Sequence, residues 1–174
     1  MNFTIEKSIE VLESTPNVLN VMLQHVSTAW TSVNEGGDTW SVYDIVGHLI
    51  HGEKTDWMQR AEIILSEKTD KTFKPFDRFA QFKESEGKSL QHLLDEFTIL
   101  RKKNIELLLS KKITGKDFEK KGIHPAFGEV TLSHLLSTWV VHDLNHLAQI
   151  CRVMAKQYKP AVGPWAKYLG ILKE

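Results

Sequence analysis

Residues 131–157 have the sequence TLSHLLSTWVVHDLNHLAQICRVMAKQ. Apolar residues recur in it at intervals of three and four, and neither proline nor glycine interrupts them, which predicts one long helix. A helix with this pattern turns its apolar face toward the core of a helical fold. The residues of that face are Leu135, Trp139, Ile150 and Val153.

The same helix carries two histidines, His142 and His146, that lie four residues apart and therefore one above the other. At about 100° per residue, both fall within roughly 20° of the line through Leu135 and Val153. Burial of two imidazoles costs free energy unless each finds a partner. They are either core histidines bonded to carboxylates or carbonyls, or two ligands of a metal ion.

Two familiar metal motifs fit this stretch poorly. The segment His142-Asp143-Leu144-Asn145-His146 has aspartate where the zinc-protease motif H-E-x-x-H has its general base. A carboxylate-bridged di-iron bundle needs two Glu-x-x-His motifs, and only Asp143 to His146 resembles one. Neither a protease nor a di-iron protein is therefore favoured.

A third ligand has to come from another helix, and His48 is the better candidate. It falls on the edge of the apolar face of a helix predicted over residues 41–65, beside Ile45 and Gly52. His51 points more than about 90° away from the centre of that face. A lone histidine at the edge of an apolar helix face is more often structural. The pair at positions 142 and 146 is what favours His48 as a metal ligand.

The five remaining histidines have no assigned role. His124 precedes Pro125 in a glycine-rich loop, where it either caps a cavity or simply turns the chain. Cys151 is the single cysteine, which excludes an internal disulfide framework and a cysteine-based zinc cluster. The expected role of Cys151 is that of a small buried hydrophobe. Any metal in this chain would therefore be held by imidazoles.

Apolar spacing outside residues 131–157 is helical almost throughout. Ser41 and Asp44 form a predicted capping box that opens the helix over residues 41–65. Thr15-Pro16 is typical of a helix start, with proline at the first helical position. The pattern predicts helices over residues 5–12, 16–30, 41–65, 89–109 and 131–157, and a short C-terminal helix over residues 165–172.

Two long connections separate these helices. Residues 66–88 contain four phenylalanines, which predicts a packed connection because such rings need burial. Residues 111–130 are irregular, and no alternating run in the chain is long enough to demand a sheet. The prediction is an all-α fold, a four-helix bundle with long crossover loops and a short C-terminal helix, with residues 1–174 as a single domain.

Composition excludes several classes of protein. The chain has 174 residues with 22 basic and 22 acidic side chains, and a net charge of zero argues against binding to nucleic acid. It has no run of 18 apolar residues, which argues against a membrane span. The N-terminus lacks the apolar region of a signal peptide, so we expect a cytoplasmic protein.

Several short motifs are spread over nearly the whole chain. These motifs are Trp40-Ser41, His48-Leu49-x-x-x-Glu53 with Trp57, Phe76-Asp77-Arg78, His124-Pro125-x-Phe127-Gly128, His142-Asp143-x-x-His146-x-x-Gln149-Ile150 and Val162-Gly163-Pro164-Trp165. Together, and in this order, they resemble the motifs of the DinB/YfiT superfamily.

The resemblance implies a four-helix bundle with a divalent metal held by one histidine of the second helix and two of the last. Carried over to this chain, those ligands are His48, His142 and His146. Members of the family hold nickel or zinc, and many are homodimers. The better understood members are bacillithiol transferases and mycothiol-dependent isomerases, which use low-molecular-weight thiols.

We therefore expect a metal-dependent transferase that acts with a small-molecule thiol on a small electrophile. A non-catalytic metal- or ligand-binding stress-response bundle and a metal-dependent hydrolase remain as alternatives. No catalytic residue is assigned, although Glu53 and Asp143 are available to support the metal ligands. The far side of the helix over residues 131–157 is also apolar, which predicts a homodimer. That side carries Val140, Val141, Leu144, Ala148 and Cys151.

Overall fold

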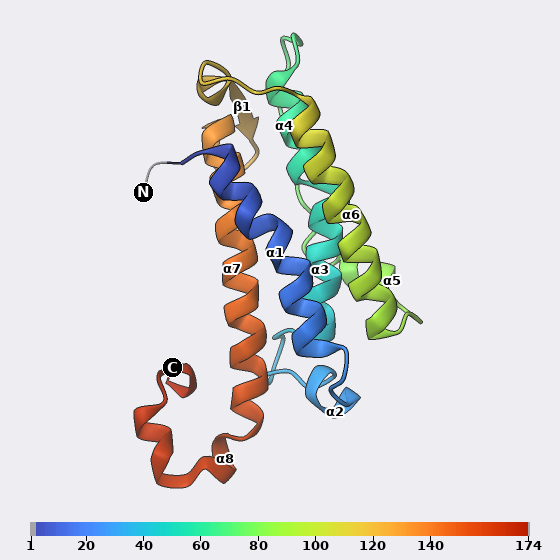
Figure 1. The fold of residues 1–174 in the computed structure, drawn as a ribbon, viewed down its shortest axis with the longest axis vertical. Helices are drawn as coiled ribbons and strands as arrows, with labels where there is room; N and C mark the ends of the chain where they lie inside the picture. The colour runs from blue at the N-terminus through green and yellow to red at the C-terminus, as the bar shows by residue number, and fades with distance from the viewer. Residues whose placement is uncertain (1–2, 174) are drawn as a thin grey trace.

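The computed structural model describes residues 3–173, and most of them are helical (Figure 1). Four long helical segments make a bundle, which confirms the predicted fold class. The predicted helices over residues 41–65, 89–109 and 131–157 are each reproduced to within a residue or two. The segments are α1 (Ile5–Leu23), α3 (Val42–Thr55) continued by α4 (Trp57–Leu65), α6 (Leu90–Ser110) and α7 (Leu132–Gln157).

The first helix differs from its prediction because α1 continues through Pro16. Proline has no N–H to donate to the carbonyl four residues earlier, which is that of Leu12. That carbonyl instead accepts a hydrogen bond of 2.8 Å from Nη1 of Arg101 on α6. A tertiary contact thus satisfies the group that proline leaves free, and the predicted helix start at Thr15-Pro16 is wrong.

The stretch over residues 111–130, predicted to be irregular, contains a small sheet that the sequence pattern did not indicate. Strands β1 (Lys121–His124) and β2 (Gly128–Thr131) form an antiparallel hairpin. Each strand has four residues, too few to show a clear alternation in the sequence. Gly122 lies directly against the Phe73 ring, where an added Cβ would come within 2.6 Å of the ring carbons. The hairpin is therefore held to the bundle by packing that the sequence pattern does not reveal.

The connection over residues 66–88 is only partly packed. Phe73 is buried and donates its backbone N–H to the Ile123 carbonyl, which ties the connection to the hairpin. Phe79 and Phe82 are 67% and 46% exposed, so the expectation that these rings are buried is wrong for these two. They flank the start of a short helix, α5 (Ala80–Ser85), that packs against α3.

The C-terminal segment is less regular than predicted. In place of a helix over residues 165–172, the chain forms α8 (Lys159–Val162) and then two 3₁₀ turns, η2 (Gly163–Tyr168) and η3 (Gly170–Leu172). The remaining short elements are α2 (Thr28–Thr31) and the 3₁₀ turn η1 (Asp117–Glu119). Within residues 3–173, no helix combines the length and apolar character that a membrane crossing requires.

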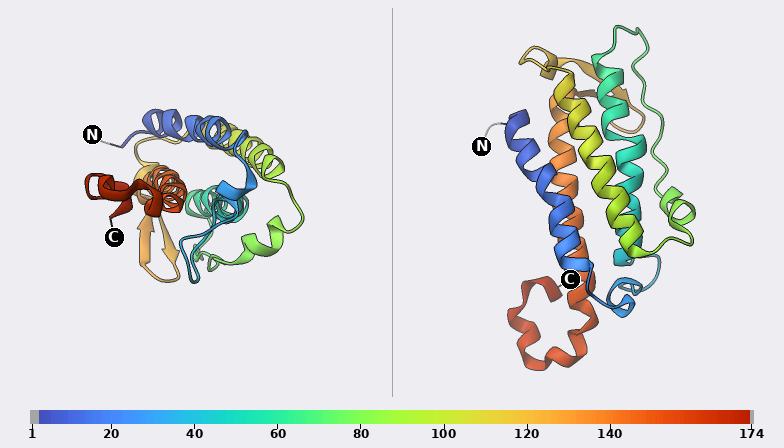
Figure 2. Two further views of the ribbon diagram at one scale, coloured as in Figure 1. Left: turned by 90° about the horizontal axis from the view of Figure 1, so that it is seen from below. Right: turned by 45° about the vertical axis from the view of Figure 1, so that its right-hand side comes forward.

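The arrangement of the layers creates room for a site on one side of the bundle. Figure 2 shows α1 and α6 on one side of α3 and α7, with the hairpin and the connection carrying α5 on the other. Two apolar clusters fill the interior, one around Trp57 and Trp139 and the other around Leu49 and Phe97. The hairpin and the connection leave the facing sides of α3 and α7 only partly covered.

Candidate metal centre

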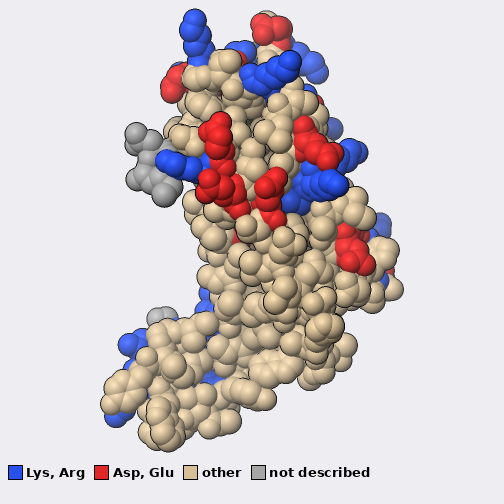
Figure 3. All heavy atoms as spheres, viewed as in Figure 1, with Lys and Arg blue, Asp and Glu red and all other residues tan. Residues whose placement is uncertain are grey.

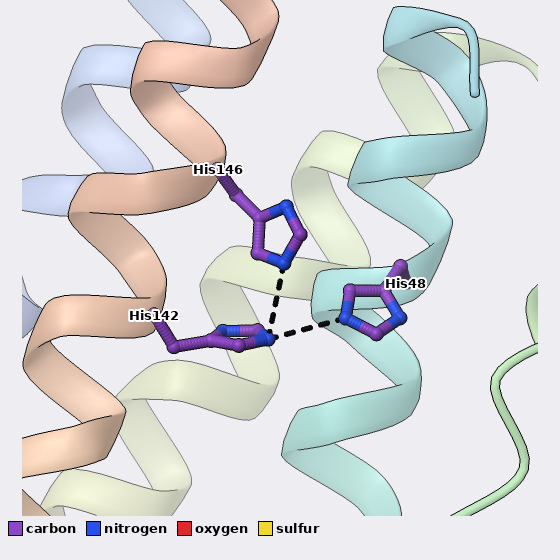
Figure 4. Close-up of side chains that lie close together, drawn as sticks. All are labelled: His48, His142 and His146. Atoms are coloured by element: carbon purple, nitrogen blue, oxygen red, sulfur yellow. Dashed lines mark hydrogen bonds between the residues drawn. The ribbon is translucent and has the colours of Figure 1, made fainter. Parts of the chain in front are cut away.

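Three histidines from two helices meet on the partly covered side of the bundle (Figure 4). His48 comes from α3, which begins at the Ser41 capping box, and His142 and His146 come from α7. Nε2 of His142 lies 3.1 Å from Nε2 of His48 and 3.1 Å from Nε2 of His146. Their candidate ligand atoms all lie within 4.8 Å of one another, so the structure brings together the three residues that the sequence singled out.

Burial keeps these imidazoles neutral. It lowers the pKa of His48 to about 3 and that of His142 to about 2, with smaller contributions from the neighbouring histidines. The pKa of His146 is also lowered, mainly by burial. Neutral imidazole is the form that binds metal ions, so the site is set for coordination across the ordinary pH range.

The hydrogen bonds orient at least one ring for coordination. Nδ1 of His146 lies 2.8 Å from Oε1 of Gln149, an atom that only accepts, so the proton is on Nδ1 and the lone pair of Nε2 faces the other two rings. Nδ1 of His48 and of His142 have no hydrogen-bond partner within residues 3–173. Neutral imidazole nitrogens that converge from three side chains are a ligand set typical of zinc and similar divalent ions. The donor set therefore fits a divalent metal ion.

The two carboxylates that the sequence left available to support the ligands have a different role. Glu53 and Asp143 both bind the buried guanidinium of Arg101, with N–O distances of 2.9 Å and 2.6 Å. Asn104 and Trp139 also donate hydrogen bonds to Glu53. This network was not predicted from the sequence, although Arg101 lies four residues after Phe97 and four before Ile105, on the apolar stripe of its helix. A cation on such a stripe needs buried carboxylates as partners.

A cavity of about 850 Å³ adjoins the three histidines. Aromatic rings make up much of its wall, and two of them pack on the ligand rings, with centroids 4.7 Å apart for Trp40 and His48 and 5.0 Å apart for Trp57 and His142. The cavity is large enough for a small organic molecule. Its charged and polar lining includes Asp56, Arg60, Arg78, His124 and Asn145.

Comparison with known proteins places this architecture in a family. The family model for the DinB superfamily matches residues 12–150. This chain belongs to the DinB superfamily. Two proteins from different strains of Bacillus cereus, each named "Putative metal-dependent hydrolase", are 27% identical to it over 150 residues, covering 84% of this chain and 83% of theirs.

A solved structure shows the same fold. It is that of YfiT from Bacillus subtilis, described as "a probable metal-dependent hydrolase with an unusual four-helix bundle topology". Its TM-score against this chain is 0.75, with 21% sequence identity and 90% of both chains covered. The two proteins thus share the four-helix bundle although their sequences are only distantly similar.

Two further histidines of this DinB-superfamily chain are partly or wholly buried. His124 lines the cavity, and its Nδ1 accepts hydrogen bonds from the backbone N–H groups of Ala126 and Phe127, so it both borders a cavity and shapes a turn. His51 is buried, although the helical wheel placed it off the apolar face. The reason is that α5 covers this side of α3, where Nδ1 of His51 lies 3.0 Å from Oε1 of Glu84.

The remaining sulfur and imidazole groups are not part of the histidine triad. Cys151 is partly buried and does not line the cavity. The exposed histidines are His25, His92 and His134, of which His134 borders the cavity and completes the capping box of α7.

Proposed function

We propose that this chain is a metal-dependent enzyme that binds one divalent cation, zinc or nickel, through His48, His142 and His146. The observation that carries the proposal is the convergence of three neutral imidazoles, through Nε2, beside a cavity of about 850 Å³. When bound, such a cation provides Lewis acidity and lowers the pKa of a thiol or water molecule that joins it. The cavity would hold the molecule that reacts.

Side chains around the triad support that role. Trp40 and Trp57 pack on two of the ligand rings and shield them from bulk water. Phe76 contributes a further contact, with its ring centroid 5.5 Å from that of His48. Gln149 holds the Nδ1 proton of His146 and thereby keeps Nε2 directed at the other two ligands. A site fixed in this way reacts without a large rearrangement of its ligands.

The reaction that we favour is transfer of a low-molecular-weight thiol to a small electrophile. Such a reaction needs a reactive sulfur, and the cavity contains no cysteine of the protein itself. The thiol would therefore be a cosubstrate, and its thiolate is the nucleophilic form. Asp143, which adjoins His142 in the sequence, and Glu53, which lies on the same helix as His48, are both bound to Arg101 and are not free to act as bases.

Hydrolysis is the second candidate, and Asp56 favours it. This carboxylate lines the cavity, and burial raises its pKa to about 6, a value suited to proton transfer near neutral pH. The names of the Bacillus relatives point to the same class of reaction. The two candidates differ in whether turnover requires an added thiol.

The test is an activity assay on the purified protein loaded with zinc or with nickel. One arm follows a fluorogenic electrophile with a panel of small thiols, and the other follows ester and amide hydrolysis without thiol. Thiol-dependent turnover that is lost in His142→Ala supports the transferase, and His25→Ala is the matched control because His25 is exposed. Thiol-independent turnover supports the hydrolase. Metal binding without turnover in either arm contradicts an enzymatic role.

A further inference from the structure

The cavity contains two arginines whose charges are not fully neutralised. Arg60 is buried, and its Nε lies 2.8 Å from Oδ1 of Asp56, but its two terminal nitrogens have no acceptor within residues 3–173. Arg78 lines the same cavity and forms no ion pair with any described residue. With Asp56 as the acidic residue of the lining, the cavity wall has an excess of positive charge even without a metal ion.

Arg60 belongs to a cluster at the hairpin side of the cavity. Its Cζ lies 5.3 Å from the centroid of the Phe73 ring, and that centroid is 6.3 Å from the centroid of His124. Phe73 is fixed in place by its backbone hydrogen bond to Ile123. A guanidinium and an imidazole thus pack near the same apolar ring, and both groups line the cavity.

His124 presents a hydrogen-bond donor in this cluster. Because its Nδ1 accepts two backbone N–H groups, the proton of the neutral ring lies on Nε2. Burial and the charge of Arg60 lower its pKa, which keeps the ring neutral. The Nε2–H group has no acceptor within residues 3–173 and is free to donate to a ligand.

Arg78 supplies positive charge near the metal ligands. It follows Phe76, whose ring contacts both His48 and His51. Its charge is one of the smaller influences that lower the pKa of His48. The cavity is thus bordered by cations beside the hairpin and beside the histidine triad, with aromatic rings between them. A cavity lined in this way raises the local concentration of anions.

We propose that the molecule bound in this cavity is a small organic anion with an apolar body, whose charged group is held by Arg60 and the Nε2–H of His124. Guanidinium binds carboxylate, phosphate and sulfonate groups through two parallel hydrogen bonds, and the aromatic wall takes the apolar part. The proposal rests on the proposed function in taking this cavity as the substrate site. It concerns binding alone, so it is tested without turnover.

The experiment compares two fluorescent probes of nearly the same shape on the metal-loaded protein. One is 1-anilinonaphthalene-8-sulfonate, an apolar anion, and the other is N-phenyl-1-naphthylamine, its neutral counterpart. We expect the anion to bind more tightly and to lose about tenfold in affinity in Arg60→Gln, and several-fold in Arg78→Gln, with the neutral probe unchanged. Arg78 is exposed on a connection, so its variant keeps the test open if Arg60→Gln does not fold.

Arg152→Gln is the matched control, because Arg152 pairs with Glu35 outside the cavity and its loss changes the net charge by the same amount. Equal affinity for the two probes, or the same loss in Arg152→Gln as in the cavity variants, overturns the proposal. Arginine-dependent binding without any turnover contradicts the proposed reaction but leaves the anion site standing. Turnover together with probe binding that depends on neither arginine contradicts the anion site but leaves the proposed reaction standing.

Discussion

Asp56 lies at the junction of α3 and α4, where it faces the cavity and pairs with Arg60. Only 8% of the residue is exposed, and burial raises its pKa above that of a free carboxyl despite the nearby guanidinium. The folded protein therefore holds the Asp56 proton more tightly than the unfolded chain does. A charge kept in such a place at neutral pH reduces stability, which is typical of residues retained for a functional reason.

The raised pKa of Asp56 predicts that the difference in stability between wild type and Asp56→Asn depends on pH. The ordinary pKa of an aspartate side chain is 3.8 and that of Asp56 in the fold is about 6, so wild type loses stability relative to the variant as pH rises from about 4 to about 6. The total loss is roughly 3 kcal/mol, and the difference is constant above that window. Urea unfolding of both proteins at several pH values measures it. A difference that does not change between pH 4 and pH 8 contradicts the prediction.

The positions of single residues were predicted correctly from the sequence where one helix alone sets them relative to each other. The spacing of His142 and His146 is fixed by α7 alone, and the apolar stripe of α7 indicated which way they point. Arg60 and Arg78 could not be assigned to the site, because their positions depend on how the hairpin and the connection fold over α3 and α7. His51 shows the same limit, since the cover that buries it comes from α5.

At the scale of elements, Arg101 connects the four long segments of the bundle. It bonds to the Leu12 carbonyl of α1, to Glu53 of α3 and to Asp143 of α7 from its own place on α6. Its guanidinium also packs over Phe97 and Trp139, which belong to the two different apolar clusters. Because Asp143 adjoins His142, this network also fixes the register of the helix that carries two of the candidate ligands.

Replacement of Arg101 by methionine should be severely destabilising. It removes the cation that pairs with two buried carboxylates and the donor to the Leu12 carbonyl, and breaking a buried pair costs about 3–5 kcal/mol. The matched control is Lys103→Met, which removes an exposed cation from the same helix and should change stability by no more than about 0.5 kcal/mol. Chemical denaturation of the three proteins gives the comparison. Equal stabilities for the two variants would show that the network does not hold the bundle together.

Elements were predicted correctly where local pattern and tertiary packing agree. The capping box at Ser41 and the uninterrupted stripe of α7 are local signals, and both helices begin where expected. Pro16 is a local signal for a helix start that Arg101, 85 residues further along the chain, overrides. The hairpin depends on Phe73 packing against Gly122. These two residues are far apart in the chain, so their contact leaves no periodic pattern in the sequence.

At the scale of the whole molecule, the outer face of α7, which is the face opposite its buried stripe, predicts self-association. Val141 and Leu144 are 62% and 49% exposed on the face opposite the buried stripe. Figure 3 shows charged side chains gathered over the upper part of the face it draws, while the lower part carries few. We propose that a second copy of the chain covers the outer face of α7, because exposed apolar surface of this kind marks an interaction site.

We therefore expect the mass of a dimer in light scattering at micromolar concentration. Leu144→Glu should shift the protein to a monomer, because a carboxylate on an apolar interface loses its hydration. Leu109→Glu is the matched control, since Leu109 is 55% exposed at the end of α6. A monomeric wild type, or equal masses for the two variants, would contradict an interface on α7.

We propose above that His48, His142 and His146 hold one divalent metal ion. Elemental analysis of the purified protein after loading with zinc or nickel tests it most directly. We predict about one metal ion per chain in wild type and in the control His25→Ala, and well under half of that in His48→Ala, His142→Ala and His146→Ala. Full metal content in all three ligand variants would show that these histidines do not hold the metal ion.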